Sequence, residues 1–253
     1  MGNGEGPAPL TPLKGMILMG KNPKVFIDGK GGVVGARLYE QLSRRSDLDF
    51  LIIDPEKRRD VEERRKLLNE ADLAILCLPE ETAAQAVELV DNPNTRIIDT
   101  SPAHRTTPGW VYGFAELLPG QRQRIRFSKR VANPGCHASG FLSTVAPLVQ
   151  MGMLPPDYPV SCFSITGYSG GGKDMIAEFE DPNRDPALAA PALYSLELRH
   201  NHLNEMQHIA GLEYPPVFVP ILSDMYSGMA TSVTLQNRLL RGTPTAQDIC
   251  EML

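Results

Sequence analysis

The sequence predicts an α/β protein whose first half is a parallel, doubly wound sheet and whose second half has a different, α+β arrangement. Two observations predict the first half: short apolar runs alternate with helical patterns, and a glycine-rich loop follows the first of these runs. Strands that alternate with helices in this way form parallel sheets. A third observation predicts the change of architecture, because the alternation stops beyond a helical segment that ends near residue 150.

The composition is that of an ordinary globular chain of 253 residues, 42% hydrophobic and 22% charged. This length suffices for one large domain or two smaller ones. A formal net charge of −5 argues against nucleic acid or an anionic membrane as a partner, and no apolar run approaches the roughly 20 residues of a membrane span. The N-terminus has no secretion-signal pattern. The four cysteines are scattered without disulfide or metal-site spacing, so we expect a cytoplasmic protein with reduced thiols and no metal.

The first ordered elements form a candidate binding site for a dinucleotide. Residues 1–20 are rich in glycine and proline and are expected to be a disordered tail. A strand is predicted at Val25–Asp28, followed by a Gly-x-x-Gly-x-x-Gly loop and then a helical pattern. In this context the glycines let the backbone approach a pyrophosphate, and the helix N-terminus attracts it; an ordinary strand-to-helix turn is the alternative. The candidate cofactor residues are Gly29, Gly32, Val33, Val34 and Gly35.

The second predicted strand, Phe50–Ile53, is followed by residues that distinguish two forms of the dinucleotide. Asp54 comes next, and an acid at this position usually binds the ribose hydroxyls of NAD. Lys57, Arg58 and Arg59 follow at once, and such a cluster can pair with the 2′-phosphate of NADP. A solvated helix face fits the same basic residues, so this stretch alone leaves the choice open.

Two more strands extend the predicted sheet. An apolar run at Leu73–Pro79 is typical of a buried parallel strand, Glu80–Val90 is helical, and Arg96–Asp99 is a further strand. Polar residues directly after a strand lie at the carboxyl edge of the sheet, where ligands bind. A capping serine and a surface histidine are the alternative interpretation. The site candidates at this edge are Ser101, His104 and Arg105.

The turn Asn133-Pro134-Gly135-Cys136 is the strongest local signal in the sequence. It precedes an apolar helical segment over Phe141–Val149. A thiol at a helix N-terminus faces unpaired N–H groups and the positive end of the dipole, which lower its pKa and favour the reactive thiolate. A buried structural cysteine is the common alternative, but a packing residue does not require a tight turn before it. We therefore expect Cys136 to be a nucleophile.

The second half is predicted to contain another sheet, with strands at Val160–Thr166, Val217–Ile221 and Thr231–Leu235. A glycine-rich loop, Gly167–Lys173, follows the first of these strands. Three successive glycines suggest close approach of a ligand or a tight chain crossing. The loop is not a phosphate-binding P-loop, because Asp174 follows the lysine.

A polar group lies between these strands, and a cysteine nucleophile needs a proton carrier from it. Its members are Tyr194, Arg199, His200, Asn201, His202, Asn204 and Glu205. Histidine titrates in the appropriate range, but spacing does not choose between His200 and His202. Residues two apart diverge on a helix, which disfavours a metal site.

Several of these segments together resemble the N-acetyl-γ-glutamyl-phosphate reductases, most closely the shorter, second type of that family. The segments are Asn133–Cys136, Gly167–Lys173, His200–Met206, the start of the glycine loop at Ile27-Asp28-Gly29, and Asp99–Arg105. The resemblance covers about Lys24 to Gln236. The motifs are specific when they are taken jointly, whereas the glycine loop alone would not be.

The resemblance implies a fold and a division into domains. It predicts a Rossmann domain that binds NADP(H) over residues 21–133. An α+β catalytic domain, of the kind found in semialdehyde and glyceraldehyde-phosphate dehydrogenases, is expected over residues 134–253. It also predicts a homo-oligomer, a dimer or a tetramer, that binds a small-molecule substrate.

A reaction is implied as well: the NADPH-dependent reduction of N-acetyl-γ-glutamyl phosphate to N-acetylglutamate 5-semialdehyde and phosphate, in arginine biosynthesis. By resemblance, the Cys136 thiolate attacks the acyl phosphate and the thioester accepts hydride, with His200 as acid/base. We expect Arg58, Arg59 and Ser101 to contact the cofactor together with the glycine loop. The residues expected to meet the substrate are Tyr194, Arg105, Lys173 and Arg199.

Two features depart from the family pattern. His137 follows the cysteine, where a tyrosine is common. The chain ends at Leu253, whereas the family continues with a strand and a Gly-Lys-Gly-rich segment that opens a helix beside the nicotinamide, so the catalytic domain is expected to be C-terminally incomplete. The alternatives left open are a cysteine-dependent acyltransferase or hydrolase, a shortened non-catalytic NADP-binding relative, and an acyl-phosphate reductase of lysine biosynthesis.

Overall fold

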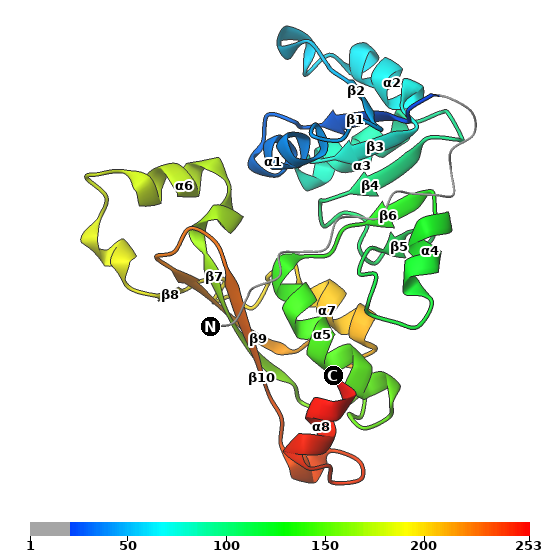
Figure 1. Ribbon diagram of the computed structural model, residues 1–253. Helices are drawn as coiled ribbons and strands as arrows, with labels where there is room; N and C mark the ends of the chain where they lie inside the picture. Colours follow the sequence, from blue (N-terminus) through cyan, green and yellow to red (C-terminus); the bar gives the residue numbers. More distant parts are fainter. Residues whose placement is uncertain (1–20) are drawn as a thin grey trace, which may run out of the picture.

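The computed structural model describes residues 21–253, so the tail expected at residues 1–20 lies outside the described part of the chain. Two sheets organise the rest (Figure 1). The first sheet and its helices occupy the upper part of Figure 1, and the second sheet lies below with the long helix α5 beside it. Within the described range, no helix is long and apolar enough to cross a membrane.

The first sheet has six strands in the order β2-β1-β3-β4-β6-β5, and every pairing is parallel. Its strands are β1 (Lys24–Asp28), β2 (Asp49–Leu51), β3 (Leu73–Leu76), β4 (Arg96–Asp99), β5 (Val111–Tyr112) and β6 (Arg130–Ala132). The helices between them are α1 (Val33–Leu42), α2 (Val61–Glu70), α3 (Glu80–Glu88) and α4 (Gln121–Phe127), with a 3-10 turn η1 at Pro55–Lys57. This arrangement confirms the parallel, doubly wound sheet expected from the alternating pattern.

Helices cover both faces of this sheet, which explains the continuous apolar runs of its central strands. On one face, Val25 and Ile27 of β1 pack in one cluster with Leu38 of α1. On the other face, Phe26 packs in a cluster with Leu68 of α2. Successive residues of β1 therefore point into two different cores, so the strand cannot alternate apolar with polar residues.

The strand ends form one row across the sheet. Asp28 is paired with Leu76, Leu76 with Asp99, and Asp99 with Ala132. Because the strands are parallel, the loops that follow these four residues all leave from the same edge. The glycine loop and the turn before Cys136 are two of these loops.

The second sheet has four strands in the order β10-β7-β9-β8. They are β7 (Ser161–Gly167), β8 (Ala192–Leu193), β9 (Val217–Ser223) and β10 (Met229–Thr234). β7 and β9 are parallel, and the two outer pairings are antiparallel. The helices here are α5 (Cys136–Gln150), α6 (Lys173–Glu180), α7 (Leu203–Ala210) and α8 (Ala246–Met252), and the 3-10 turns are η2 (Tyr168–Gly171), η3 (Pro186–Ala189) and η4 (Asn237–Leu239). The three strands expected in this half are present, each with its ends shifted by a residue or two.

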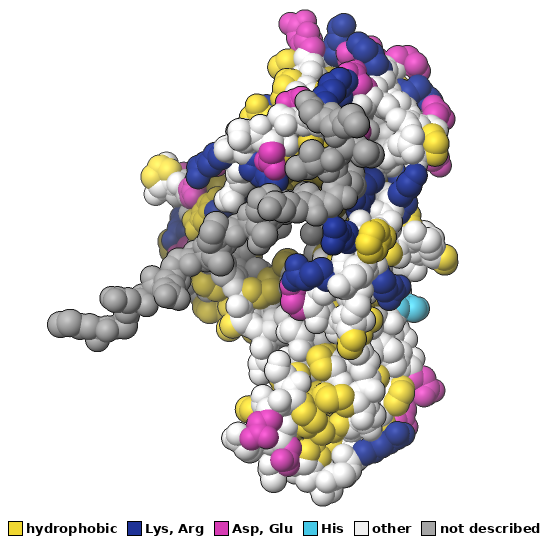
Figure 2. Space-filling view, turned by 45° about the vertical axis from the view of Figure 1, so that its right-hand side comes forward, with side chains coloured by type: hydrophobic (Ala, Val, Ile, Leu, Met, Phe, Trp, Pro, Cys, Tyr) yellow, Lys and Arg dark blue, Asp and Glu magenta, His cyan; other side chains and the backbone are white. Residues whose placement is uncertain are grey.

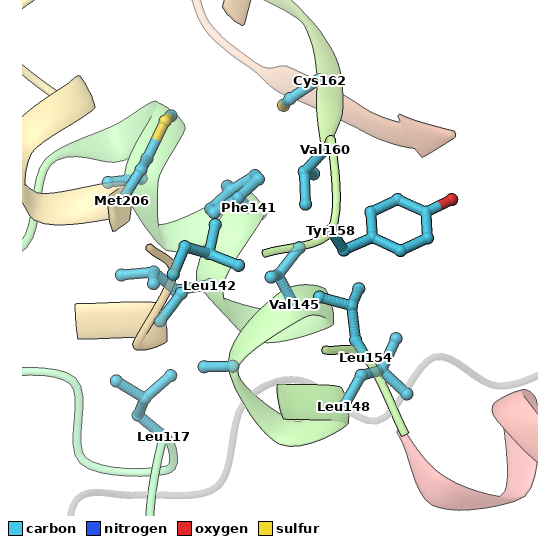
Figure 3. Packing of buried hydrophobic residues seen from close by; sticks show 14 of the residues in the cluster. Leu117, Phe141, Leu142, Val145, Leu148, Leu154, Tyr158, Val160, Cys162 and Met206 are labelled. Carbon is cyan, nitrogen blue, oxygen red and sulfur yellow. The ribbon is translucent and has the colours of Figure 1, made fainter. Parts of the chain in front are cut away.

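The core of this half lies between α5, α7 and one face of the second sheet. Figure 3 shows Phe141 and Val145 of α5 among side chains from neighbouring elements, including Cys162 of β7 and Met206 of α7. All four side chains are fully buried. This packing fixes the position of α5, and hence of the cysteine at its first residue.

The glycine loop packs more closely than any larger residue would permit. Gly29 has φ +85°, and a Cβ added there would lie 2.1 Å from the Cys77 carbonyl oxygen. A Cβ added at Gly35, in the first turn of α1, would lie 2.4 Å from the Gly29 carbonyl oxygen. The two glycines therefore bring α1 directly onto the end of β1.

Gly35→Ala is expected to lower the free energy of unfolding by about 1–3 kcal/mol, because the new methyl group must displace loop backbone. Gly31→Ala is the matched control, since a Cβ there meets nothing within 4 Å, and it should change that free energy by no more than about 0.5 kcal/mol. Urea unfolding of the two variants measures the difference. Equal midpoints would contradict the close approach of Gly29 and Gly35.

Candidate active site

The chain leaves the first sheet at β6 and turns at once into α5. The N–H of Asn133 donates to the Asp99 carbonyl oxygen at 2.7 Å, which extends the strand pairing by one residue. Gly135 is the extended N-cap residue of α5, and Cys136 is the first residue of the helix. The Gly135 carbonyl accepts from the Ser139 N–H at 2.8 Å, which closes the first helical turn. The thiol thus stands at a helix N-terminus on the ligand-binding edge of the sheet.

The carboxylate of Glu205, in α7, holds this turn from behind. Its Oε2 accepts a hydrogen bond from the Gly135 N–H at 3.0 Å and from the Tyr112 hydroxyl at 2.6 Å. Its Oε1 accepts from the Arg105 guanidinium at 2.6 Å. Glu205 is 1% exposed, so its charge is removed from water and is compensated by three donors. It joins β5, the loop after β4 and the cysteine turn to α7.

Glycine is required at position 135 because of this convergence. A Cβ there would lie 2.3 Å from Glu205 Oε1, 2.5 Å from His202 Nε2 and 2.7 Å from Arg105 Nη1. None of these atoms can retreat easily, since all three side chains are nearly enclosed. The Pro-Gly-Cys sequence therefore reflects crowding behind the turn as well as the sharpness of the turn itself.

The environment of Cys136 corrects one expectation from sequence. The residue is exposed on one side, but desolvation by the surrounding protein is the largest influence and raises the pKa of its thiol. The N–H groups of His137 and Cys136 and the charge of Arg105 act in the opposite direction, and Glu205 adds to the rise in pKa. The helix N-terminus does favour the thiolate, but desolvation outweighs it, so the pKa is not lowered as expected.

Three histidine rings gather beside the cysteine turn. The ring centroids of His200 and His202 are 4.6 Å apart, and His137 lies 5.6 Å from the first and 5.7 Å from the second. Burial is the main cause that lowers the pKa of each ring, to about 4 for His137 and about 2 for His202. All three are therefore neutral imidazoles near pH 7.

The two histidines that spacing could not separate differ in burial. His202 is 7% exposed, and its Nδ1 has no hydrogen-bond partner among residues 21–253. His200 is partly exposed, and its Nδ1 accepts a hydrogen bond from the His202 N–H at 3.1 Å. A neutral ring that accepts at Nδ1 carries its hydrogen on Nε2, so His200 presents an Nε2–H donor on its other side.

The residues expected to meet the substrate fall into two groups. Tyr194 lies within the histidine cluster, with its hydroxyl 2.8 Å from His137 Nε2. Arg105 is nearly enclosed, and it donates to Glu205, to the Asn133 carbonyl and to the Thr100 carbonyl. Lys173 and Arg199 are exposed, and neither has an ion-pair partner among the residues that the structure describes. Arg105 therefore helps to hold the cysteine turn in place, whereas Lys173 and Arg199 form no ion pair within residues 21–253.

The residues expected to hold the dinucleotide form an open helix N-terminus. Gly32 is the N-cap of α1 and has no side chain to cap it. The N–H groups of Val33, Val34 and Gly35, in the first turn, have no helical acceptor. Because Gly32 carries no side chain that could cap these groups, the loop fits a pyrophosphate.

A pocket of about 460 Å³ lies beside this helix start. Val33, Val34 and Arg37 of α1 line one side of it, and Ser169 and Gly170 of η2 line the other. The glycine-rich segment after β7 therefore faces the helix that begins at the dinucleotide loop. The run of glycines there is not explained by close packing against the first half, because a Cβ added at Gly170 or Gly172 would meet no atom of the first half within 4 Å.

The remaining cofactor candidates lie at the same edge but differ in accessibility. Arg58 and Arg59 are exposed in the segment after β2, while the Asp54 side chain accepts from the Glu56 N–H and so caps η1. Ser101 is 4% exposed and donates its hydroxyl hydrogen to Asp99 at 2.7 Å.

In the view of Figure 2, most Lys and Arg side chains lie in the upper half, around the first sheet, and a hydrophobic patch covers part of the lower half.

Sequence reasoning missed one residue of this site, Tyr112, and the role of another, Glu205. Tyr112 lies in β5, which is too short to produce a periodic pattern. The role of Glu205 was hidden because its partners Arg105, Tyr112 and Gly135 are 70–100 residues away in sequence. The one local signal was a carboxylate directly before the apolar Met206, on the buried side of α7.

Comparisons with known proteins agree with this architecture. Residues 24–125 match the family described as "Semialdehyde dehydrogenase, NAD binding domain", and residues 136–253 match "Semialdehyde dehydrogenase, dimerisation domain". The chain is 45% identical over 229 residues to "N-acetyl-gamma-glutamyl-phosphate reductase 2" of Pseudomonas putida, covering 90% of this chain and 72% of that protein. It is 45% identical over 233 residues to "N-acetyl-gamma-glutamyl-phosphate reductase" of Brucella anthropi, covering 91% and 75%.

Solved structures with the same fold are more distant in sequence. A probable aspartate-semialdehyde dehydrogenase from Pseudomonas aeruginosa has a TM-score of 0.68 at 17% identity, and the match covers 92% of this chain and 79% of that one. Aspartate semialdehyde dehydrogenase II from Vibrio cholerae has a TM-score of 0.66 at 18% identity with the same coverage. These matches confirm the expected fold class.

Glu205→Gln is expected to lower the free energy of unfolding by about 3 kcal/mol, because one of three buried donors then faces an N–H₂ group and the Arg105 charge loses its counterion. Denaturant unfolding measures this loss. Glu178→Gln, on the exposed surface of α6, is the matched control and should leave the midpoint unchanged. A Glu205 variant as stable as that control would show that the carboxylate does not hold the turn.

Proposed function

The chain belongs to the semialdehyde dehydrogenase family and, within it, to the N-acetyl-γ-glutamyl-phosphate reductases, and from this premise we propose that it reduces N-acetyl-γ-glutamyl phosphate to N-acetylglutamate 5-semialdehyde and phosphate with NADPH. This reaction belongs to arginine biosynthesis. The observation that carries the proposal is the position of Cys136: it is the first residue of α5, on the sheet edge that also carries the glycine loop. A nucleophile and a dinucleotide site that share an edge suit hydride transfer to a thioester.

Residues 21–133 act as the cofactor domain and residues 134–253 as the substrate domain in this proposal. The open N–H groups at Val33, Val34 and Gly35 hold the pyrophosphate, with Gly29 and Gly32 shaping the loop. Ser101 supports this edge through Asp99. When bound, NADPH supplies the hydride. The choice of NADP over NAD rests on Arg58 and Arg59, whose exposed guanidinium groups suit a 2′-phosphate.

The chemistry of the chain centres on the Cys136 sulfur. The thiolate attacks the acyl carbon, the C–O bond to phosphate breaks, and inorganic phosphate leaves with the bonding electrons. The acyl group is then held as a thioester on Cys136. Reduction gives a thiohemiacetal, which collapses with cleavage of the C–S bond to release the aldehyde and the thiolate. The N–H groups of the α5 N-terminus and the charge of Arg105 favour the thiolate, both before it attacks the acyl phosphate and when it is released from the thiohemiacetal.

His200 is the acid/base in this proposal. Its partial exposure and its Nε2–H donor support the role, whereas His202 is enclosed and lies against the Gly135 backbone. Tyr194 lies beside His200, with ring centroids 5.8 Å apart. Lys173 and Arg199, both exposed cations, are proposed to meet the carboxylate or phosphate of the substrate, and Arg105 holds the turn.

The chain forms an oligomer, as the family description of residues 136–253 indicates, and we propose a homodimer or a tetramer of such dimers. The uncovered face of the second sheet supports this assembly. Phe163 and Ile165 of β7 are 45% and 38% exposed on it, while Cys162 and Ser164, which alternate with them along the strand, are buried against the helices. Exposed apolar side chains on a sheet face favour burial against another copy. A cytoplasmic location, where Cys136 stays reduced, completes the proposal.

Cys136→Ser is expected to abolish reduction of the acyl phosphate while leaving NADPH affinity largely intact, since the thiol is the nucleophile and lies outside the dinucleotide loop. Cys250→Ser, on the exposed surface of α8, is the matched control and should retain full turnover. Oxidation of NADPH followed by absorbance, with binding followed by calorimetry, separates the two effects. Retained turnover in Cys136→Ser would exclude the thioester, and turnover without nicotinamide would point to a hydrolase.

His200→Asn is expected to lower turnover by about a hundredfold or more, in the range of general acid–base loss. His202→Asn serves for comparison and should act mainly on stability, because the residue is buried. Steady-state kinetics and thermal unfolding of both variants distinguish the roles. The reverse pattern would assign the proton transfer to His202.

Arg58→Ala and Arg59→Ala are expected to weaken NADPH binding by about tenfold each, the loss of one charge-assisted hydrogen bond to a phosphate, with little effect on NADH. Calorimetric titration with both nucleotides gives the ratio. Arg238→Ala, exposed in η4 of the other half, should change neither. Equal weakening of NADPH and NADH by the Arg58 and Arg59 variants would count against a 2′-phosphate site.

A further inference from the structure

A chain of hydrogen bonds runs through the protein interior behind Cys136. The imidazole of His137 is hydrogen-bonded at both nitrogens, with Nδ1 2.7 Å from the Ser164 hydroxyl and Nε2 2.8 Å from the Tyr194 hydroxyl. The Ser164 hydroxyl is in turn 3.0 Å from that of Thr231. His137 is 2% exposed and Ser164 is fully buried. These hydrogen bonds therefore link β10 and β7 to the Tyr194 hydroxyl in the active site.

The hydrogen bonds from Thr231 to Tyr194 can point in one of two directions, which differ in which group of each pair is the donor. Burial, and then the neighbouring His200, lower the pKa of His137 to about 4, so near pH 7 its neutral ring carries a single hydrogen on one of its nitrogens. If the hydrogen is on Nδ1, the Tyr194 hydroxyl donates to Nε2, and its hydrogen cannot then be donated to a group in the active site. If the hydrogen is on Nε2, it is donated to the Tyr194 oxygen, and the hydroxyl hydrogen of Tyr194 is free for the active site.

The surroundings favour the second direction at both ends. The Thr231 hydroxyl can donate to Ser164 at 3.0 Å, and Ser164, which then needs an acceptor for its own hydrogen, donates to Nδ1 of His137. At the other end, burial and next the charge of Cys136 raise the pKa of Tyr194 to about 12. The phenol thus keeps its hydrogen, and whenever Cys136 is the thiolate its negative sulfur attracts that hydrogen away from His137.

We propose that Tyr194 is a catalytic hydrogen-bond donor to the oxygen of the acyl carbon held on Cys136, and that His137 is a positioning residue that aims this donor by carrying its own hydrogen on Nε2. The inference rests on the proposed function, since it names a further residue of the same site. Negative charge develops on that oxygen when hydride reaches the thioester carbon, and a donor fixed in advance stabilises it without reorganisation. Ser164 and Thr231 fix the direction from the buried end.

The direction of the chain is tested first, by NMR of protein labelled with ¹⁵N in histidine. We expect His137, assigned by the loss of its signals in His137→Gln, to show a protonated Nε2 and a bare Nδ1, and to stay neutral on acidification to about pH 5, since its pKa is about 4. A hydrogen on Nδ1 would overturn the proposal. This measurement needs no turnover, so it also decides the direction if the acyl phosphate proves not to be a substrate, which would refute the proposed function alone.

Kinetics of the acyl-phosphate reduction test the role of the donor. Tyr194→Phe should lower kcat by about a hundredfold with KM nearly unchanged, the loss of one donor to a developing oxyanion. Tyr214→Phe, which alters an exposed tyrosine elsewhere, should change neither constant. His137→Gln should lower kcat in the unmodified protein but not further in Tyr194→Phe, because its effect acts through that hydroxyl. Undiminished kcat in Tyr194→Phe, or independent losses that multiply in the double variant, would overturn the assignment.

Discussion

The carboxylate of Glu205 is the contact on which the geometry around Cys136 depends. Removing a carboxylate from water costs several kcal/mol, which only close, well-directed donors recover. Here the donors come from the Gly135 backbone, the Tyr112 hydroxyl and the Arg105 guanidinium. Because these groups belong to the cysteine turn and to the first sheet, α7 of the second half can satisfy its buried charge only when the two halves are docked. The turn, the sheet edge and the histidine cluster are thereby placed by one interaction.

The same contact explains why the cysteine follows a glycine and begins a helix. The crowding behind position 135 excludes any side chain, and the extended conformation of that residue directs the next one outward as the first residue of α5. The helix itself is fixed by its apolar side chains, among them Phe141 and Val145, which are fully buried. Packing at one end of α5 and the carboxylate at the other thus determine where the thiol points.

Sequence patterns predicted the features that depend on local chemistry. Apolar runs gave the strands, because both faces of the first sheet are covered, and the spacing of Gly29, Gly32 and Gly35 gave the loop, because close backbone packing permits only glycine there. The contacts of Glu205 could not be predicted in this way, since its side-chain partners lie 93 and 100 residues away. The direction in which the Cys136 pKa is shifted also could not be predicted from the sequence. It depends on desolvation by surrounding segments as well as on the helix that the residue begins.

Desolvation of Cys136 and of the nearby histidines determines which groups can stabilise a negative charge on the sulfur. Burial lowers the pKa of His137, His200 and His202, so the rings next to the sulfur are neutral and offer no imidazolium to pair with a thiolate. Positive potential near Cys136 comes instead from the helix N–H groups and from Arg105, whose charge Glu205 largely balances. A weakly compensated thiolate is a stronger nucleophile than one held in an ion pair, since nucleophilicity falls as the thiol pKa falls. Neutral imidazoles, which can both donate and accept, are then suited to guide hydrogen bonds and protons to the substrate oxygen while the sulfur keeps its reactivity.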